Sequence, residues 1–263
     1  MNKNKYRFFI KNQCWVSLMI SLLCLFFGFL HHSIHYNRIG IVFLLTLSAY
    51  NFICYQSSWA ENRFKKKSFY LVFICLLLVV CLLYQEKDIR QFFHILLVGS
   101  IVIMYKSDFV KVSLRNVPLL KIFLIAFAWA YTVLWIGNEW DANDFTAFIL
   151  IYLFIIGITI PFDICDMHTD EIITLPKWLG IRTSKGISCI CLSLSALLFI
   201  LSFYNQIDMQ YVWAWVITCL SAIGMVVLMG EKDLFFFTRF WMETCSGLPV
   251  LLVVLQKIRV VLL

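Results

Sequence analysis

The sequence predicts an all-α fold: a polytopic membrane helix bundle with about nine transmembrane helices. The 263-residue chain is 62% hydrophobic and only 14% charged, with a mean hydropathy of +0.87. Soluble domains are closer to half apolar and a quarter charged. The apolar residues form runs long enough to cross a bilayer, and the basic residues gather in alternate connections. Long apolar runs without period-2 alternation favour helices over a transmembrane barrel.

The apolar runs set the number of predicted spans. A transmembrane helix needs about 20 mostly apolar residues, and about 17 can suffice. Nine segments qualify: 14–30, 39–57, 68–84, 91–105, 117–137, 145–162, 186–204, 211–229 and 245–263. The fourth segment is short and the ninth contains Lys257 and Arg259, so eight spans remain an alternative. No linker rich in Pro, Gly or Ser divides the chain, which predicts a single domain over residues 1–263.

The basic residues predict the orientation, because Lys and Arg are enriched in cytoplasmic connections. With the N-terminus inside, the inside segments hold 17 Lys and Arg residues and the outside segments hold five. We therefore expect a cytoplasmic N-terminus with a retained first span, in an integral membrane protein that best suits a bacterial inner membrane. The net charge of +7 then reflects topology and contact with anionic membrane lipids, and no nucleic-acid partner is expected.

Three aspartates follow the sixth apolar run, in the stretch PFDICDMHTDEIITLPKWLG. Asp163, Asp166 and Asp170 have the spacing i, i+3 and i+7, which would place their carboxylates on one face of a helix. Pro161 is expected to break or kink that helix just before them. Ionisable residues in membrane segments are functional by default. Mg²⁺ is commonly bound through carboxylates and substrate phosphates, so the cluster predicts a Mg²⁺–diphosphate site.

Two alternatives to this metal site follow from the same residues. The aspartates can form a solvated acidic loop that is balanced by Lys177, Arg182 and Lys185. They can also form the ion site of a transporter, although such sites lie near the bilayer midplane rather than at its edge.

The aspartate stretch resembles the second aspartate-rich motif of the UbiA superfamily of intramembrane prenyltransferases. The three aspartates match the D-x-x-D-x-x-x-D spacing, and Thr174, Leu175, Pro176 and Gly180 match the T-L-P and small-residue turn that follow. The resemblance implies a UbiA-like fold. It also implies Mg²⁺-dependent transfer of an isoprenyl group from a prenyl diphosphate to an aromatic or lipophilic acceptor.

The resemblance also implies roles for particular residues. Asp163, Asp166 and Asp170 would be the catalytic residues and the Mg²⁺ ligands. Asn51 matches the asparagine of the family's first motif, while Tyr105, Lys111 and Arg115 lie in the segment that faces diphosphate in the family. The expected substrate-binding residues are Asn51, Tyr105, Lys111, Arg115, Lys177 and Arg182.

The chain departs from the family in the first motif, N-x-x-x-D-x-x-x-D, at the end of the second span. Tyr55 and Trp59 replace its two aspartates, and Glu61 is two residues out of register. Bases at Arg63 and Lys65–Lys67 could neutralise phosphate in place of a second metal. The alternative is a catalytically inactive relative that binds a lipid, a quinone or a protein partner.

Aromatic residues in the spans are candidates for lining a prenyl-chain tunnel, where their rings could shield a carbocation. Tyr50, Trp129 and Trp135 are the residues considered, and core packing is the alternative for each of them.

Overall fold

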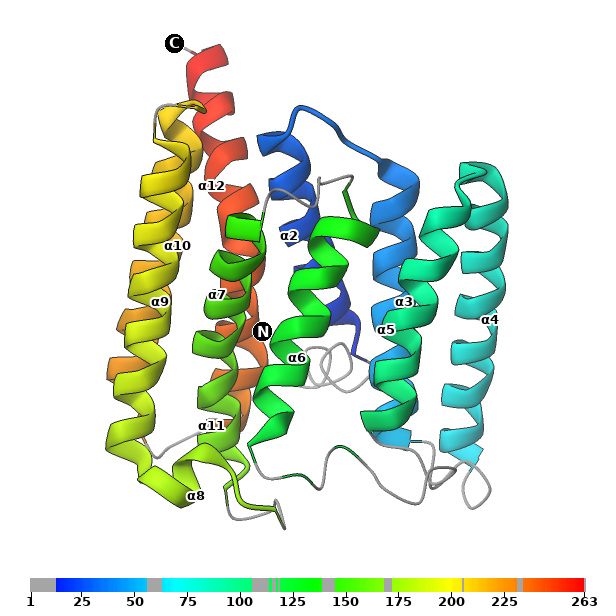
Figure 1. Ribbon diagram of the computed structural model, residues 1–263, viewed down its shortest axis with the longest axis horizontal. Coiled ribbons are helices and arrows are strands. Elements are labelled where there is room, and N and C mark those ends of the chain that lie inside the picture. Colours follow the sequence, from blue (N-terminus) through cyan, green and yellow to red (C-terminus); the bar gives the residue numbers. More distant parts are fainter. Residues whose placement is uncertain are drawn as a thin grey trace.

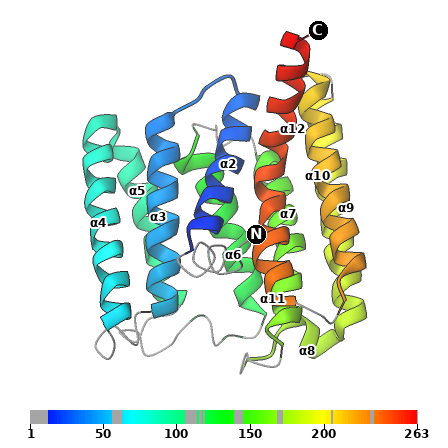
Figure 2. The ribbon, with the colours of Figure 1, turned by 180° about the vertical axis from the view of Figure 1, so that it is seen from behind.

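The computed structural model of the protein describes residues 13–55, 63–105, 114, 117, 119–138, 145–167, 172–204, 206–230 and 234–262. Within these residues the regular structure is helical and no β-strand is present, which confirms the all-α class. The long helices stand side by side, and successive ones run in opposite directions (Figure 1). The same arrangement is seen from behind in Figure 2.

The helices follow the predicted apolar segments. Two of them contain π-helical turns, η3 at the end of α6 and η4 before α12. In chain order the elements are α2 (Cys14–Leu30), α3 (Tyr36–Tyr55), α4 (Arg63–Glu86), α5 (Ile89–Tyr105), α6 (Leu120–Tyr131), η3 (Thr132–Ile136), α7 (Phe145–Cys165), α8 (Leu175–Leu179), α9 (Ile181–Phe203), α10 (Met209–Leu228), α11 (Leu234–Phe236), η4 (Phe237–Met242) and α12 (Glu243–Leu262).

Six helices in the described part of the chain are long and apolar enough to cross a membrane. They are Tyr36–Tyr55, Lys67–Glu86, Phe145–Cys165, Ile181–Phe203, Met209–Leu228 and Phe237–Ile258. Three shorter apolar helices, Cys14–Leu30, Ile89–Tyr105 and Leu120–Ile136, occupy the other predicted spans. A 17-residue helix is about 25 Å long, slightly less than the ~30 Å hydrocarbon core of a bilayer.

The helix order brings distant parts of the chain into contact. Helix α7 packs between α6 and α9, while α12 packs against both α2 and α10. Helix α4 packs mainly against α3, at the edge of the bundle (Figure 1). The ends of α3, α5, α7 and α10 and the beginnings of α4, α6, α9 and α12 lie at one end of the bundle, the lower end in Figure 1.

A buried aromatic cluster joins α2, α7, α9 and α10. The indole of Trp215 stacks on Phe26 and Phe199, with ring centroids 5.7 and 5.3 Å apart, and lies 5.0 Å from the ring of Phe154. Its Nε1 donates a hydrogen bond to Ser195 Oγ at 3.3 Å, and Ser195 Oγ donates to the Leu150 carbonyl at 2.7 Å. These contacts satisfy the polar atoms of a deeply apolar core.

Charged residues at the upper end of the bundle neutralise one another. Arg38, at the start of α3, is only 3% exposed, and it forms ion pairs with Glu86 at 3.3 Å and Asp88 at 3.4 Å. Asp88 also pairs with Arg90 at 3.2 Å. Partial burial opposes the ionisation of Asp88, but hydrogen bonds from Arg90 and the charges of Arg90 and Arg38 hold its pKa below the usual value. This network fixes the turn between α4 and α5 to α3.

Of the two effects expected of Pro161, a break or a kink, the break does not occur, because α7 continues through Pro161 to Cys165. A proline has no N–H for the carbonyl four residues earlier, which here is Gly157. Ser188 on α9 supplies the missing donor, since its Oγ donates to the Gly157 carbonyl at 2.6 Å. A neighbouring hydroxyl of this kind is a known way in which membrane helices tolerate proline.

We expect Gly157→Ala to destabilise the protein, because α7 and α9 touch at this position. A Cβ at Gly157 would lie 2.6 Å from Leu192 Cγ and 3.2 Å from the Ser188 carbonyl oxygen. Overpacking of this kind costs about 1–3 kcal/mol. The control is Gly186→Ala in α9, where a Cβ meets nothing within 4 Å and helix propensity favours alanine. Equal unfolding free energies for the two variants in detergent would contradict the close contact.

Candidate functional site

A cavity of about 450 Å³ lies between the helices of the bundle. Its walls come from α2, α3, α5, α6, η3, α7, η4 and the first residue of α12. Aliphatic side chains line its inner part, among them Ile20, Leu45, Ile101, Leu124 and Ile158. Ionisable side chains from the lower ends of the helices line the other part: Tyr105, Lys121, Asp163, Asp166, Arg239 and Glu243. The pocket is therefore amphipathic, with its charge at one end.

Two ion pairs occupy the charged end of the pocket. Lys121 Nζ on α6 lies 2.8 Å from Asp163 Oδ1 on α7, and the side chains are only 13% and 1% exposed. Arg239 Nη2 on η4 donates to Asp166 Oδ2 at 3.3 Å, and these side chains are 31% and 27% exposed. Both pairs connect the end of α7 to another helix. Two of the predicted motif aspartates thus carry a cationic partner within the same pocket.

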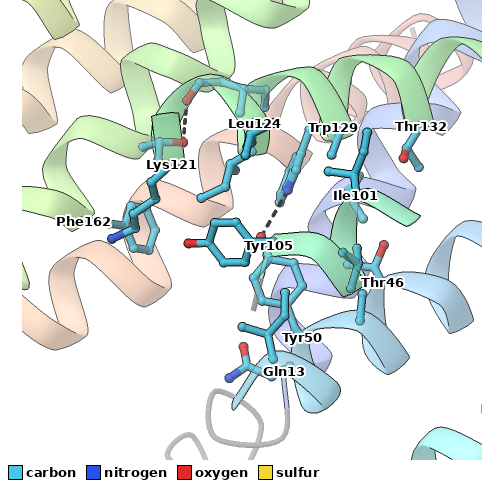
Figure 3. Close-up of a pocket in the computed structure, with 18 of the residues that line it drawn as sticks. Gln13, Thr46, Tyr50, Ile101, Tyr105, Lys121, Leu124, Trp129, Thr132 and Phe162 are labelled. Atoms are coloured by element: carbon cyan, nitrogen blue, oxygen red, sulfur yellow. Dashed lines mark hydrogen bonds between the residues drawn. The ribbon is translucent and has the colours of Figure 1, made fainter. Parts of the chain in front are cut away.

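Aromatic hydroxyls and a further carboxyl complete the polar lining. Trp129 Nε1 donates to the Tyr50 hydroxyl at 3.1 Å across the α3–α6 boundary (Figure 3). Figure 3 also shows the Tyr105 hydroxyl directed toward the side of the pocket where Lys121 and Phe162 lie. Glu243 lies near enough to Tyr50 and Arg239 to interact electrostatically with both.

The position of Arg239 depends on the π-helical turn η4. The Arg239 guanidinium lies over the Phe235 ring, with Cζ 4.9 Å from the centroid. The turn is held against α2 by Trp15, which stacks on Phe240 at 4.7 Å and donates its Nε1 hydrogen to the Phe240 carbonyl at 3.2 Å. Single π-helical turns are frequent at functional sites, because they re-aim side chains within a helix.

The structure brings only part of the predicted residue set together. Asp163, Asp166 and Tyr105 line one pocket, as do the tunnel candidates Tyr50 and Trp129. The third tunnel candidate, Trp135, packs instead against the rings of Tyr131 and Phe148. Helix α7 ends at Cys165, and Asp166 lies in the following turn, where its N–H still donates to the Phe162 carbonyl at 2.9 Å. Asp170, Lys111 and Arg115 lie outside the described residues.

Three other predicted substrate-binding residues do not line the pocket. Asn51 is buried between α3 and α4, where its Nδ2 donates to the Leu47 carbonyl at 2.8 Å and its Oδ1 accepts from Ser68 Oγ at 3.2 Å. Lys177 on α8 and Arg182 on α9 are exposed. Asn51 therefore makes hydrogen bonds within α3 and to α4 and does not line this pocket.

Three pocket residues were missed as site residues from the sequence: Lys121, Arg239 and Glu243. Each interrupts a strongly apolar segment, in VPLLKIFLIAFAWA and FFFTRFWMETCSG. Ionisable residues in membrane segments usually face the protein interior and mark a site, so this rule alone would have selected them. Their association with the aspartates could not be read from the chain, because Lys121 lies on α6, Arg239 and Glu243 lie on the continuous helix η4–α12, and the aspartates lie on α7 and in the turn after it.

The two pocket aspartates have suitable donor atoms for Mg²⁺. No group of three or more His, Cys, Asp or Glu side chains suited to a metal is found among the described residues. Mg²⁺ is often bound through only one or two carboxylates, with water and substrate phosphates as the other ligands. Asp163 and Asp166 fit that arrangement, although each carboxylate is also in contact with a base. Comparison of the chain with protein-family models, curated proteins and solved structures gave no match.

Proposed function

We propose that the protein is an integral-membrane prenyltransferase of UbiA type, which transfers an isoprenyl group from a prenyl diphosphate to an aromatic or lipophilic acceptor. One observation carries the proposal: an apolar cavity inside the helix bundle ends at Asp163, Asp166, Lys121 and Arg239. A prenyl diphosphate matches this division of the pocket into an apolar and a charged part, because it has an apolar chain and a highly charged end. Ligand pockets of this kind are usually apolar with a few polar groups that fix the orientation.

The reaction begins with cleavage of the bond between the prenyl carbon and the diphosphate oxygen. The bonding electrons leave with the diphosphate, and Lys121 and Arg239 stabilise its charge at the charged end of the pocket. Mg²⁺, held by Asp163 and Asp166, would supply further positive charge to the leaving group. The allylic cation forms a bond with the acceptor, which then loses a proton. Glu243 is the proposed proton acceptor, since it is the remaining carboxyl in the pocket lining.

The aromatic side of the pocket suits the cationic stage of this reaction. Tyr50, Trp129 and Tyr105 present ring faces and edges to the cavity. Aromatic rings attract cations and do not react as readily as water would. The hydrogen bond between Trp129 and Tyr50 holds both rings in place without adding a charge.

The proposal includes the membrane topology. In it, the three shorter apolar helices also cross the membrane, which gives nine spans with a cytoplasmic N-terminus, in a bacterial inner membrane. Five basic residues belong to helices or turns at the end of the bundle that carries the pocket charges: Lys121, Lys177, Arg182, Lys185 and Arg239. The diphosphate end of the substrate would then enter the pocket from the cytoplasmic side, where it is in contact with water.

A specific observation favours a second candidate, a relative that binds a prenyl lipid or quinone without catalysis. Tyr55 and Trp59 stand where the family's first aspartates are expected, and both pocket aspartates contact bases. In the catalytic proposal Lys121 and Arg239 replace the charge that a second Mg²⁺ would provide. In the binding-only candidate they neutralise the aspartates permanently.

Turnover by the purified protein separates these two candidates. Farnesyl diphosphate, Mg²⁺ and a panel of phenolic and quinol acceptors are incubated with protein in nanodiscs, and released diphosphate and prenylated product are measured. We expect product from the wild-type protein, a loss of at least about 10-fold in Arg239→Gln, and no change in Arg90→Gln. Arg90 is the control because it is 77% exposed at the opposite end of the bundle. Farnesyl diphosphate binding without product from any acceptor would favour the binding-only protein.

A further inference from the structure

Two ion pairs link four of the ionisable side chains in the pocket. Lys121 contacts Asp163 at 2.8 Å and Arg239 contacts Asp166 at 3.3 Å, and all four side chains line the same cavity. The first pair is nearly excluded from solvent, whereas the second is about one third exposed. The Nε atom of Arg239 is buried and makes no hydrogen bond to any of the residues that the structure describes, so this guanidinium has donor capacity beyond Asp166.

This pairing sets opposite requirements for an anion and a cation. A diphosphate requires the bases, and to bind them strongly it must weaken their contacts with the aspartates. A divalent cation requires the aspartates, and it must displace or share the bases. Each ligand alone therefore takes one ion-pair contact away from each of two like-charged side chains of the protein. The two ligands together supply a partner for all four side chains.

We propose that the two ion pairs exchange partners on ligand binding, with the bases moving to diphosphate and the aspartates to the divalent cation. The two ligands then bind with positive coupling, which is reciprocal by thermodynamic necessity. This inference rests on the proposed function only in assigning the pocket to a diphosphate. It adds a binding rule specific to this chain: neither ligand alone binds strongly, because each competes with an internal ion pair.

The exchange also has a structural consequence. Lys121 joins α6 to α7, and Arg239 joins η4 to α7. Breaking both contacts removes the two ion pairs that link the lower end of α7 to α6 and η4, while the packing between these helices remains. Ligand binding therefore replaces direct helix-to-helix contacts with contacts that run through the diphosphate and the cation.

The decisive test measures each ligand in the absence of the other, since removal of a competitor strengthens binding. Mn²⁺ is used as a paramagnetic probe without any phosphate, and farnesyl diphosphate is titrated calorimetrically in the presence of EDTA. We expect Arg239→Gln to raise Mn²⁺ affinity by about tenfold and Asp166→Asn to raise metal-free farnesyl diphosphate affinity by about tenfold. With Mg²⁺ present, both variants should bind farnesyl diphosphate more weakly than the wild-type protein.

These two variants are chosen because Arg239 and Asp166 are partly exposed, so either residue can be neutralised without burying an unpaired charge. Arg90→Gln is the control and should change neither affinity. Weaker binding of both isolated ligands in both variants, unchanged affinities, or no binding in any variant would overturn the exchange. If Arg239→Gln gains Mn²⁺ affinity and Asp166→Asn gains farnesyl diphosphate affinity, but no prenyl transfer is detected, the exchange stands and catalysis is rejected. If prenyl transfer is detected without these two gains in affinity, only the exchange is rejected.

Discussion

Asp163→Asn is expected to reduce prenyl transfer by at least about 100-fold, because electrostatic stabilisation of a leaving group is typically worth several kcal/mol. The Asp163 carboxylate is 1% exposed and faces both the pocket and Lys121. An amide has the same shape but no charge, so it would hold Mg²⁺ poorly. Diphosphate release and Mg²⁺-dependent farnesyl diphosphate affinity are measured together, and both should fall.

The matched control for this variant is Asp208→Asn. Asp208 precedes α10 at the opposite end of the bundle and does not line the pocket. Asp208→Asn therefore makes the same chemical change as Asp163→Asn at a site away from the pocket. Its turnover should equal that of the wild-type protein. Unchanged turnover in Asp163→Asn, with the fold intact by gel filtration, would remove Asp163 from the reaction and with it the link between the aspartate motif and catalysis.

Lys121→Met is expected to lower the free energy of unfolding by about 3 kcal/mol or more. Removing one partner of a buried ion pair leaves a carboxylate in a medium of low polarity, which typically costs 3–5 kcal/mol. Asp163 is the buried member of the pair, and Lys121 itself is 13% exposed. Methionine retains most of the lysine stem, so the change isolates the charge. Unfolding is followed in mixed micelles by denaturant titration.

The double variant Lys121→Met/Asp163→Leu distinguishes charge from packing. Replacing both members of a buried ion pair by apolar residues of similar volume is often neutral. We therefore expect the double variant to recover most of the stability that the single variant loses, while remaining inactive. A double variant as unstable as Lys121→Met would show that the lysine contributes through contacts other than its charge.

The positions of the helices were predictable because the hydropathy of the chain alone locates apolar segments. The ends of the helices were not. Helix α4 begins at Arg63 rather than at residue 68, and α9 begins at Ile181 rather than at residue 186. Both first turns contain basic residues, which hydropathy excludes from a span. A helix nevertheless continues there, because its backbone hydrogen bonds are internal and long basic side chains can reach the headgroup region.

Three residues of the candidate site were predictable from the sequence. The spacing of Asp163 and Asp166 indicated one part of the pocket lining, and the family resemblance indicated Tyr105. Lys121 and Arg239 were recognisable as bases, but their contacts with the aspartates depend on the packing of α6 and η4 against α7. The helix continued through Pro161 for a similar reason, since the donor for Gly157 comes from Ser188 on another helix. Such contacts between helices leave no local pattern in the sequence.

The proposed diphosphate site is tested most directly by calorimetric titration of farnesyl diphosphate into the purified protein with Mg²⁺, beside the variant Asp166→Ala. We expect saturable binding to the wild-type protein that depends on Mg²⁺ and is lost in the variant. Absence of binding in both folded proteins would show that Asp163, Asp166, Lys121 and Arg239 do not form a diphosphate site at the charged end of the pocket.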